Sequence, residues 1–482
     1  MSCGWTAYIP LGALTTSEFH GPASRDREHS VLILVGATIG YGALALGYSL
    51  LQWSYAVRFR REWIKAEHPR RPEARDRGEP KAVDVIVPCY NEQPEVLNAC
   101  CTALERQRRH YPGQIHVWLV DDGSQMIAAL EPVYRRFEAL PGWTVIRHPR
   151  NRGKRRAQDS AFQLGTGALV VTVDSDTTLA ATCIARLVAA MARNPKAGAI
   201  SGHVRARNAG TSRLTALIDQ RYEFLFRQER AAQSWHRAVT CCSGPVSIYR
   251  RPVLTEIWHR YVEDTFLGRQ RHFGDDLKLS LLVLEQTYDS LYWPTAKAWT
   301  IVPDTLRGYA RQQVRWNKSY YRELRRTDQA LRKHLSFGYL GLRRSPFLGL
   351  PTGHRYLRFE LAARVLLPLL PPVLLGGSAW AALTGRDDLR WVPLLVMVTV
   401  MLLLLTAIGL QARSWSFPLL YAPLHLVMLL FVRVRALLTL GNSRWGTRDV
   451  LRPWRTVKRE PSADPVGARP APGRPVAERT GS

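Results

Sequence analysis

The chain has 482 residues, of which 67 are Lys or Arg and 39 are Asp or Glu, so its formal net charge is +28. With 46% hydrophobic residues it is neither a disordered chain nor a bundle made only of membrane helices. The charge favours anionic partners: nucleic acid, an acidic membrane surface or a phosphorylated substrate. The 7 cysteines include two adjacent pairs and no CxxC spacing, which argues against a disulfide scaffold and a zinc site.

The first long apolar segment follows residues 1–30. Residues 31–57 carry no charge and exceed the roughly 20 helical residues that a bilayer core requires, so they are predicted to span a membrane. A cleaved signal peptide and a buried core helix are the alternatives. The linker 58–81 is rich in Arg, which by the positive-inside rule places the following domain in the cytoplasm and the protein in the cell membrane.

Apolar segments return near the C-terminus. Residues 365–385 and 391–412 are predicted to span the membrane, and residues 311–360 to form interfacial helices that contact membrane lipid. Residues 414–440 allow either a third crossing or an interfacial helix. The interfacial interpretation is favoured because it keeps the basic tail, 451–482, on the inner side, where we expect it to be disordered.

Residues 82–310 alternate short β-rich runs with helical stretches. The runs are AVDVIVP, HVWLVDD, TVIRHP and ALVVTVD, followed by helices expected to begin at Pro94, Gln125, Lys154 and Leu179. This alternation predicts an α/β domain with a mainly parallel sheet and helices on both faces. Ligands of such sheets bind beyond the carboxyl ends of the strands.

Two of these strand ends are acidic. Asp121 and Asp122 follow the second run, and Asp174 and Asp176 follow the fourth. Carboxylates one residue apart, as in VDSDT, can hold Mg²⁺ or Mn²⁺ while leaving coordination positions for substrate phosphates; an ordinary polar turn is the alternative. The sequence contains no GxGxxG and no GxxxxGK[ST], so it has neither a dinucleotide fingerprint nor a P-loop.

An ordered set of motifs points to one family. PCYNE, VDDGS, NRGKRRAQ, VDSDT, SGP, GDD and QQVRW together resemble family 2 of the glycosyltransferases, which are inverting enzymes that use nucleotide sugars. CCSGPVSIYR, GDDLKLS, RQQVRWNKSYYRE and WGTR look most like hyaluronan synthase, with the chitin-oligosaccharide synthases of nodulation bacteria close behind. The resemblance covers about residues 82–450 and implies a GT-A type fold.

The resemblance assigns Asp121 and Asp122 to UDP binding; a helix cap at Ser124 is the alternative. Lys154 and Arg155 lie at a predicted helix N-terminus, where cations and the helix dipole would attract a diphosphate. A solvated basic turn is the alternative for these two.

Catalysis is assigned to the same strand ends and to GDD. Asp174 and Asp176 would hold the divalent ion on the UDP phosphates. The resemblance makes Asp276 the general base and Asp275 a neighbour that orients the loop or caps a helix. Transfer with inversion needs one carboxylate base and no acid partner, because the metal assists the departure of UDP.

Three further segments are assigned to substrate by the resemblance. They are a loop against the acceptor sugar, a helical stretch against the donor diphosphate and acceptor, and a mobile gating segment, 441–450, that closes over UDP. A buried inert thiol is the alternative for the cysteine, and a lipid-facing helix is the alternative for the helical stretch. Their residues are Cys242, Ser243 and Gly244; Gln312, Gln313, Arg315 and Trp316; and Trp445 and Arg448.

The sequence therefore predicts a membrane-embedded processive β-glycosyltransferase that polymerises UDP-GlcNAc and UDP-GlcA into hyaluronan and extrudes the growing polysaccharide. The alternative enzyme is a chitin or chitin-oligosaccharide synthase that uses UDP-GlcNAc only. A membrane-anchored polyanion-binding protein is the alternative from another class. Nucleic acid is not an expected partner, because the sequence shows no helix-turn-helix, zinc-finger or RNA-binding signature.

Overall fold

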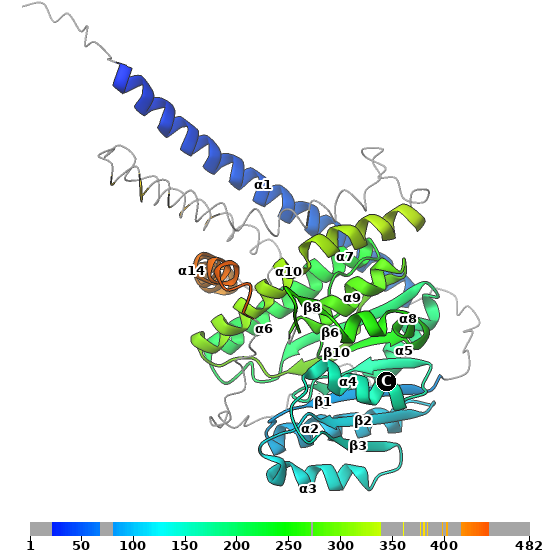
Figure 1. Ribbon diagram of the computed structural model, residues 1–482. Helices are drawn as coiled ribbons and strands as arrows, with labels where there is room; N and C mark the ends of the chain where they lie inside the picture. The colour runs from blue at the N-terminus through cyan, green and yellow to red at the C-terminus, as the bar shows by residue number, and fades with distance from the viewer. Residues whose placement is uncertain are drawn as a thin grey trace, which may run out of the picture.

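The computed structural model describes residues 22–67, 81–270, 273–338 and 416–442, together with a few single residues between the last two ranges. Figure 1 shows an α/β domain from which the long helix α1 (Pro22–Glu67) projects. The predicted segments 365–385 and 391–412, apart from single residues, and the tail 451–482 lie outside the described residues.

The described strands form an eight-stranded sheet in the order β3-β2-β1-β4-β7-β6-β10-β5 and a separate two-stranded pair, β8-β9. Neighbours are parallel except that β7 and β5 run antiparallel to the strands beside them, so the sheet is mixed. The strands are β1 (Val83–Cys89), β2 (Ile115–Asp121), β3 (Trp143–Arg147), β4 (Leu169–Thr172), β5 (Thr178–Leu179), β6 (Ala197–Ala206), β7 (Ser247–Arg250), β8 (Thr265–Phe266), β9 (Arg269–Gln270) and β10 (Asp289–Thr300).

Helices cover both faces of the sheet (Figure 1). Beside α1 they are α2 (Pro94–His110), α3 (Ile127–Glu138), α4 (Lys154–Leu164), α5 (Cys183–Arg193), α6 (Arg213–Phe224), the π-helix η1 (Leu225–Arg230), α7 (Ala231–Trp235), α8 (Arg251–Val262), α9 (Asp275–Glu285), α10 (Leu306–Gly338) and α14 (Ser416–Leu438). The predicted α/β architecture is thus confirmed.

The four predicted strands are β1 to β4, and all four are confirmed. Every residue of β4 is buried, as is all of β1 except Pro88, which explains why both runs are mostly apolar. The helix predicted from Leu179 was wrong. Thr178 and Leu179 form β5, because they pair with β10, and α5 begins only at Cys183.

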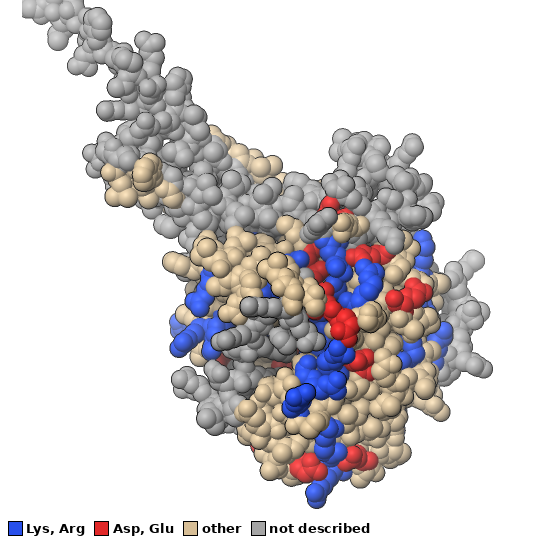
Figure 2. Space-filling model, viewed as in Figure 1, with Lys and Arg blue, Asp and Glu red and all other residues tan. Residues whose placement is uncertain are grey.

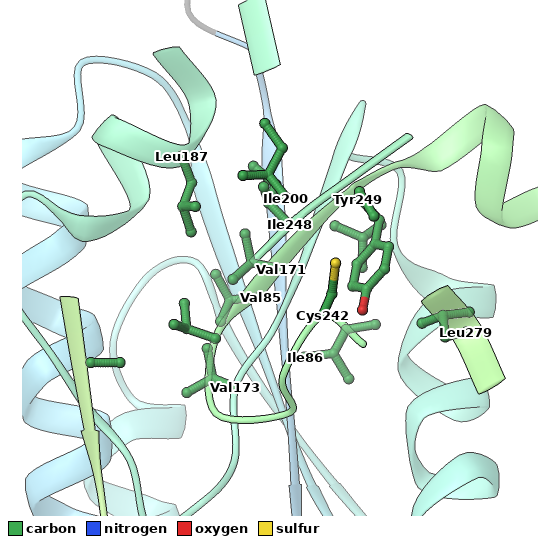
Figure 3. Close-up of a cluster of buried hydrophobic side chains, with 14 of the residues drawn as sticks. Val85, Ile86, Val171, Val173, Leu187, Ile200, Cys242, Ile248, Tyr249 and Leu279 are labelled. Atoms are coloured by element: carbon green, nitrogen blue, oxygen red, sulfur yellow. The ribbon is translucent and has the colours of Figure 1, made fainter. Parts of the chain in front are cut away.

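The core lies on both sides of the sheet. Leu187 of α5 packs from one side and Leu279 of α9 from the other, around side chains of the central strands (Figure 3). The strand residues in this view are Val85, Ile86, Val171, Ile200, Ile248 and Tyr249. This packing fixes α9, whose first turn carries Asp275 and Asp276, against the sheet.

The C-terminal half of α1 packs on the domain. The ring of Tyr55 lies edge-on to His236 at 4.4 Å, and Arg60 donates a hydrogen bond to the carbonyl of Arg227. Residues 31–57 lie inside α1, so the helical part of that prediction is confirmed. Its membrane-spanning part is not supported, because within the described part of the chain no helix has both the length and the apolar character needed to cross a bilayer.

The segment predicted at 414–440 forms α14, which packs along α10 and α6. Arg322 of α10 donates hydrogen bonds to the carbonyls of Leu440 and Asn442, just beyond the end of α14. Helix α10 begins at Leu306, ahead of the predicted boundary at 310, and continues without a break to Gly338.

Candidate active site

The site lies where the strand order reverses. Strand β1 pairs with β2 on one side and with β4 on the other, and all three are parallel. Their carboxyl ends therefore open on the same edge, and such a switch point is where open α/β sheets bind ligands. Asp121 ends β2, and Asp174 and Asp176 follow β4.

The turn after β4 presents two carboxylates. Ser175 is buried and donates a hydrogen bond to Glu92, while Asp174 and Asp176 on either side of it are partly exposed. Asp176 also accepts a hydrogen bond from Thr300 at 2.9 Å. The alternation leaves both predicted metal ligands accessible at the end of the sheet.

Lys154 is the first residue of α4 and reaches across to this turn. Its Nζ lies 2.5 Å from Oδ1 of Asp174. Burial disfavours the Lys154 ammonium, but the charges of Asp174, Asp275 and Asp276 outweigh burial and raise the pKa of Lys154 above its usual value. A methyl group placed on Gly244 would lie 3.0 Å from Asp174 Oδ2 and 3.4 Å from Lys154 Nζ. The loop 242–244, called the acceptor loop after its predicted role, therefore approaches both side chains here.

Asp122 shapes the loop that leads to Lys154. Its carboxylate accepts hydrogen bonds from the backbone N–H groups of Arg152 and Gly153, and from the ring of His148. Gly153 has φ +92°, which a residue with a side chain rarely adopts. Asp122 therefore holds the start of α4, and a contact with UDP remains a prediction.

Asp121 is buried and also serves the fold. The hydroxyl of Tyr134 donates to its Oδ1 at 2.8 Å, and the backbone N–H of Ser124 donates to its Oδ2. Ser124 was the alternative helix cap, and that interpretation was wrong: α3 begins at Ile127, and the Ser124 hydroxyl instead accepts from the N–H of Asn91.

Arg155 does not lie with Lys154. It is buried, and its guanidinium donates to Asp275 Oδ1 at 2.5 Å and to Asp264 Oδ2 at 3.0 Å. Its position does not support the predicted contact with a diphosphate, because these carboxylates engage the cation inside the domain. The predicted solvated basic turn does not describe Arg155 either.

Asp276 is the partly exposed carboxylate of the GDD motif. Helix α9 is capped by Gly274, which has φ +84°, so Asp275 and Asp276 form its first turn and neither is the cap. Burial raises the pKa of Asp276 above its usual range, although Lys154 and the N–H of Leu277 oppose this shift. A carboxylate with a raised pKa is a stronger base than an ordinary aspartate.

Cys241, rather than Cys242, lies beside this base. The thiol of Cys241 is 3.4 Å from Asp276 Oδ2. Cys242 is fully buried beside Tyr249 (Figure 3), and its sulfur lies 3.1 Å from Ser290 Oγ. The side chain of Cys242 is enclosed by the core, which supports the buried-thiol alternative. A contact of this residue with the acceptor sugar remains a prediction.

The neighbouring Ser243 faces Ser201. The two hydroxyls are 3.1 Å apart, and the N–H of Ser243 donates to the same Ser201 oxygen. Together with Gly244, Ser243 thus keeps the acceptor loop close to Asp174. Contact of Ser243 and Gly244 with a sugar remains a prediction.

Helix α10 borders the site near Tyr222 of α6. The ring of Trp316, 44% exposed, lies 6.3 Å from that of Tyr222, and Tyr222 is close enough to Asp176 and Asp174 for their charges to add to the effect of burial and raise its pKa. Gln312 has a buried Oε1 without a hydrogen-bond partner among the described residues. Gln313 and Arg315 lie on the same helix and are partly exposed.

The donor set fits a divalent ion shared with a substrate. In the described ranges, no cluster of three or more His, Cys, Asp or Glu side chains could hold a metal by itself. Mg²⁺ is usually held by one or two carboxylates and completed by substrate phosphates and water. Asp174 and Asp176 supply such a pair, and their oxygens suit Mg²⁺ and Mn²⁺.

Two of the residues at this site were not foreseen. Tyr222 and Cys241 lie on a helix and a loop, and their local sequences, QRYEF and VTCCSG, give no periodic or spacing signal for a site. The adjacent cysteines marked the loop but not which of the two faces it. Trp445 and Arg448 lie outside the described residues, as does most of the gating segment.

Basic and acidic side chains alternate in a band across the face of the domain seen in Figure 2. Lys154 pairs with Asp174 at the site, and Arg155 pairs with Asp275 in the interior behind it. These two cations are therefore compensated by carboxylates before any ligand binds.

Fold and site together define a GT-A-like sugar transferase. A solved structure supports the fold: a mannosyltransferase from Pyrobaculum calidifontis in complex with GDP-Man and Mn²⁺ superposes with a TM-score of 0.55 at 21% identity, covering 85% of this chain and 99% of that one. The model described as glycosyl transferase family 2 matches residues 84–258.

Sequence relatives cover most of the chain. An N-acetylglucosaminyltransferase of Sinorhizobium fredii is 35% identical over 435 residues, which are 90% of this chain and 96% of that protein. The N-acetylglucosaminyltransferase of Rhizobium meliloti is 36% identical over 370 residues, 76% of this chain and 81% of that protein. The chain belongs to glycosyl transferase family 2, and the predicted family is confirmed.

Proposed function

We propose that the protein is an N-acetylglucosaminyltransferase that uses UDP-GlcNAc to build β-linked chitin oligosaccharides. The observation that carries this proposal is 35% identity to a rhizobial N-acetylglucosaminyltransferase across 90% of the chain. The relatives support the alternative that uses UDP-GlcNAc only, rather than the hyaluronan interpretation.

The proposed reaction follows from the positions of the charged residues. Asp174 and Asp176 would hold a divalent ion against the donor diphosphate, and the ion would offset the negative charge that grows as UDP leaves. Lys154, 2.5 Å from Asp174, adds a fixed positive charge at the same place. Once a diphosphate is present, the Lys154 ammonium can be shared between Asp174 and a phosphate oxygen.

Asp276 acts on the acceptor in this proposal. Its carboxylate removes the proton from the attacking acceptor hydroxyl, whose oxygen forms the new bond to C1 of GlcNAc while the bond from C1 to the UDP oxygen breaks. The electron pair of that broken bond leaves with UDP. Cys241 lies beside Asp276. The ring of Trp316, which is 44% exposed, is proposed to stack on a sugar face of the acceptor.

Location and partners remain part of the proposal. Residues 31–57 carry no charge and are followed by Arg58, Arg60 and Arg61, a distribution that favours a catalytic domain on the cytoplasmic side of the cell membrane. A growing oligosaccharide and membrane lipid are the proposed partners, and Trp445 and Arg448 are proposed to close over UDP.

Incubation of membranes with labelled donors tests the proposal. UDP-GlcNAc alone should give oligosaccharides that chitinase cleaves, and UDP-GlcA should add nothing. A product formed only when both donors are present, resistant to chitinase, would contradict the proposal and restore the hyaluronan interpretation.

A further inference from the structure

Four buried charges connect α4 to α9. Arg155 of α4 lies 2.5 Å from Asp275 Oδ1 and 3.0 Å from Asp264 Oδ2, and Asp264 Oδ1 lies 2.6 Å from Nζ of Lys278 on α9. Two cations and two carboxylates thus form a neutral group, which we call the buried quartet. Each of its residues is at most 8% exposed.

Burying four charges is an unfavourable way to hold two helices together. Removing charged groups from water costs several kcal/mol per ion, and apolar side chains of similar size often stabilise a fold as well as or better than a buried ion pair. Both helices also carry buried apolar side chains, Leu277 and Leu279 in α9 and Ala157 and Ala161 in α4. Since apolar groups could serve as well, cohesion between the helices does not by itself explain why charges lie there.

Arg155 and Asp275 are each adjacent in sequence to a residue of the candidate active site, which suggests why charges are buried here. Arg155 follows Lys154, whose ammonium holds Asp174, and Asp275 precedes Asp276, the proposed base. The contact between Arg155 and Asp275 therefore joins the backbones that carry the donor side and the acceptor side of the site. Directional, short hydrogen bonds fix an orientation more sharply than apolar contacts do.

The carbonyl of Tyr261 completes the arrangement. It accepts from Arg155 Nη1 at 3.0 Å, and the guanidinium lies over the Tyr261 ring, 5.1 Å from its centre. Arg155 is thus held on three sides, by Asp275, Asp264 and Tyr261. A lysine could keep the charge but could not make the same planar set of contacts.

We propose that Arg155 and Asp275, supported by Asp264 and Lys278, are positioning residues that set the orientation of Asp276 relative to the donor-binding pair Lys154 and Asp174. This inference rests on the proposed function. It departs from the sequence-based assignment of Arg155 to the donor diphosphate. A displacement of about 1 Å between reacting groups can cost about 100-fold in rate, so a small tilt of α9 is enough to matter.

Asp275→Asn and Arg155→Lys test the proposal in the full-length protein. Each should lower kcat about 10- to 100-fold, the range typical of residues that orient a catalytic group, while KM for UDP-GlcNAc and calorimetric UDP affinity stay within about 3-fold of the parent. A rise in KM or a loss of UDP binding with kcat unchanged would overturn the proposal. Such a result would instead support the sequence-based prediction that Arg155 binds the donor diphosphate.

The combined variant Arg155→Met with Asp275→Asn separates positioning from stability. It removes one cation and one carboxylate, so Asp264 and Lys278 stay paired and no net charge is left buried. The thermal midpoint should return towards that of the parent, whereas kcat should stay low. Recovery of kcat together with the midpoint would show that the quartet only stabilises the fold and would overturn the proposal.

An ion pair at the amino ends of the strands, away from the site, offers a matched control. Arg251 makes a similar part-buried pair with Asp84, 2.5 Å apart, at the start of β1. Arg251→Lys should lower the thermal midpoint and leave kcat unchanged; an equal loss of kcat would count against a specific role for the quartet. Turnover of UDP-GlcNAc by the parent keeps the two proposals distinct, and no turnover in the parent would remove both.

Discussion

The Nζ of Lys154 lies 2.5 Å from Oδ1 of Asp174, so the first residue of α4 and the first carboxylate after β4 form an ion pair at the mouth of the sheet. The pair places a cation and a metal-ligand candidate within one hydrogen bond of each other. The negative charge of Asp174 is therefore already balanced when a metal-bound diphosphate arrives, and the ammonium is close enough to contact that diphosphate.

Lys154→Met should weaken donor binding. The variant removes the charge and leaves Asp174 without the Lys154 ammonium. We therefore expect KM for UDP-GlcNAc to rise about 10- to 100-fold, which is the size of the loss in metal affinity or activity when a residue that hydrogen-bonds to a metal ligand is removed. Steady-state kinetics at saturating metal measure this effect. Lys154→Arg, which retains the charge, should keep more of the affinity, and an unchanged KM in Lys154→Met would contradict the role given to this pair.

Asp276→Asn should remove transfer and spare binding. A positioned general base contributes about 10²- to 10⁴-fold to rate, so kcat should fall by that factor. UDP affinity measured by calorimetry should remain within about 2-fold, because Asp276 lies on the acceptor side of the site. If the variant keeps parental kcat, another group must act as the base.

The pH profile should report the same carboxylate. Burial raises the pKa of Asp276, so the group takes up a proton at a higher pH than an ordinary aspartate does. Protonation abolishes its function as a base; kcat should therefore fall as the pH drops through this raised pKa. Stopped assays from pH 4 to pH 8 measure the acidic limb, and its persistence in Asp276→Asn would show that it belongs to another group.

Gly274→Ala should disturb the base through α10. Gly274 has φ +84°, and a methyl group there would lie 2.7 Å from Ser319 Oγ and 2.8 Å from Ser319 Cβ. Gly268 offers a matched control, because it has φ +73° with open space around it. Backbone strain of about 1–3 kcal/mol applies to both, but only Gly274→Ala should also lower kcat. Equal effects in both variants would mean that the contact with Ser319 does not matter.

Much of the architecture could be predicted because it is encoded locally. Strands β1 and β4 are mostly apolar, Asp121 is the last residue of β2, and Asp174 follows β4 within two residues. Strand β5 could not be predicted in this way, since two residues carry no periodicity and become a strand only by pairing with Ala298 and Trp299.

The site shows the same division. The ordered motifs identified Lys154, Asp174 and Asp276, which the structure brings together. They did not show that Arg155 turns into the interior, because its partners Asp264 and Asp275 are more than a hundred residues away. Nor could the sequence predict which of Cys241 and Cys242 is buried and which faces the site, because a loop has no periodic pattern of burial.

Metal-dependent release of UDP from UDP-GlcNAc tests whether this site is a sugar-nucleotide transferase. We expect the full-length protein to release UDP with Mg²⁺ or Mn²⁺, EDTA to abolish release and added metal to restore it, and Asp174→Asn to be inactive while still folded. Release that is indifferent to EDTA and to Asp174→Asn, or activity only with a different nucleotide sugar, would contradict this expectation.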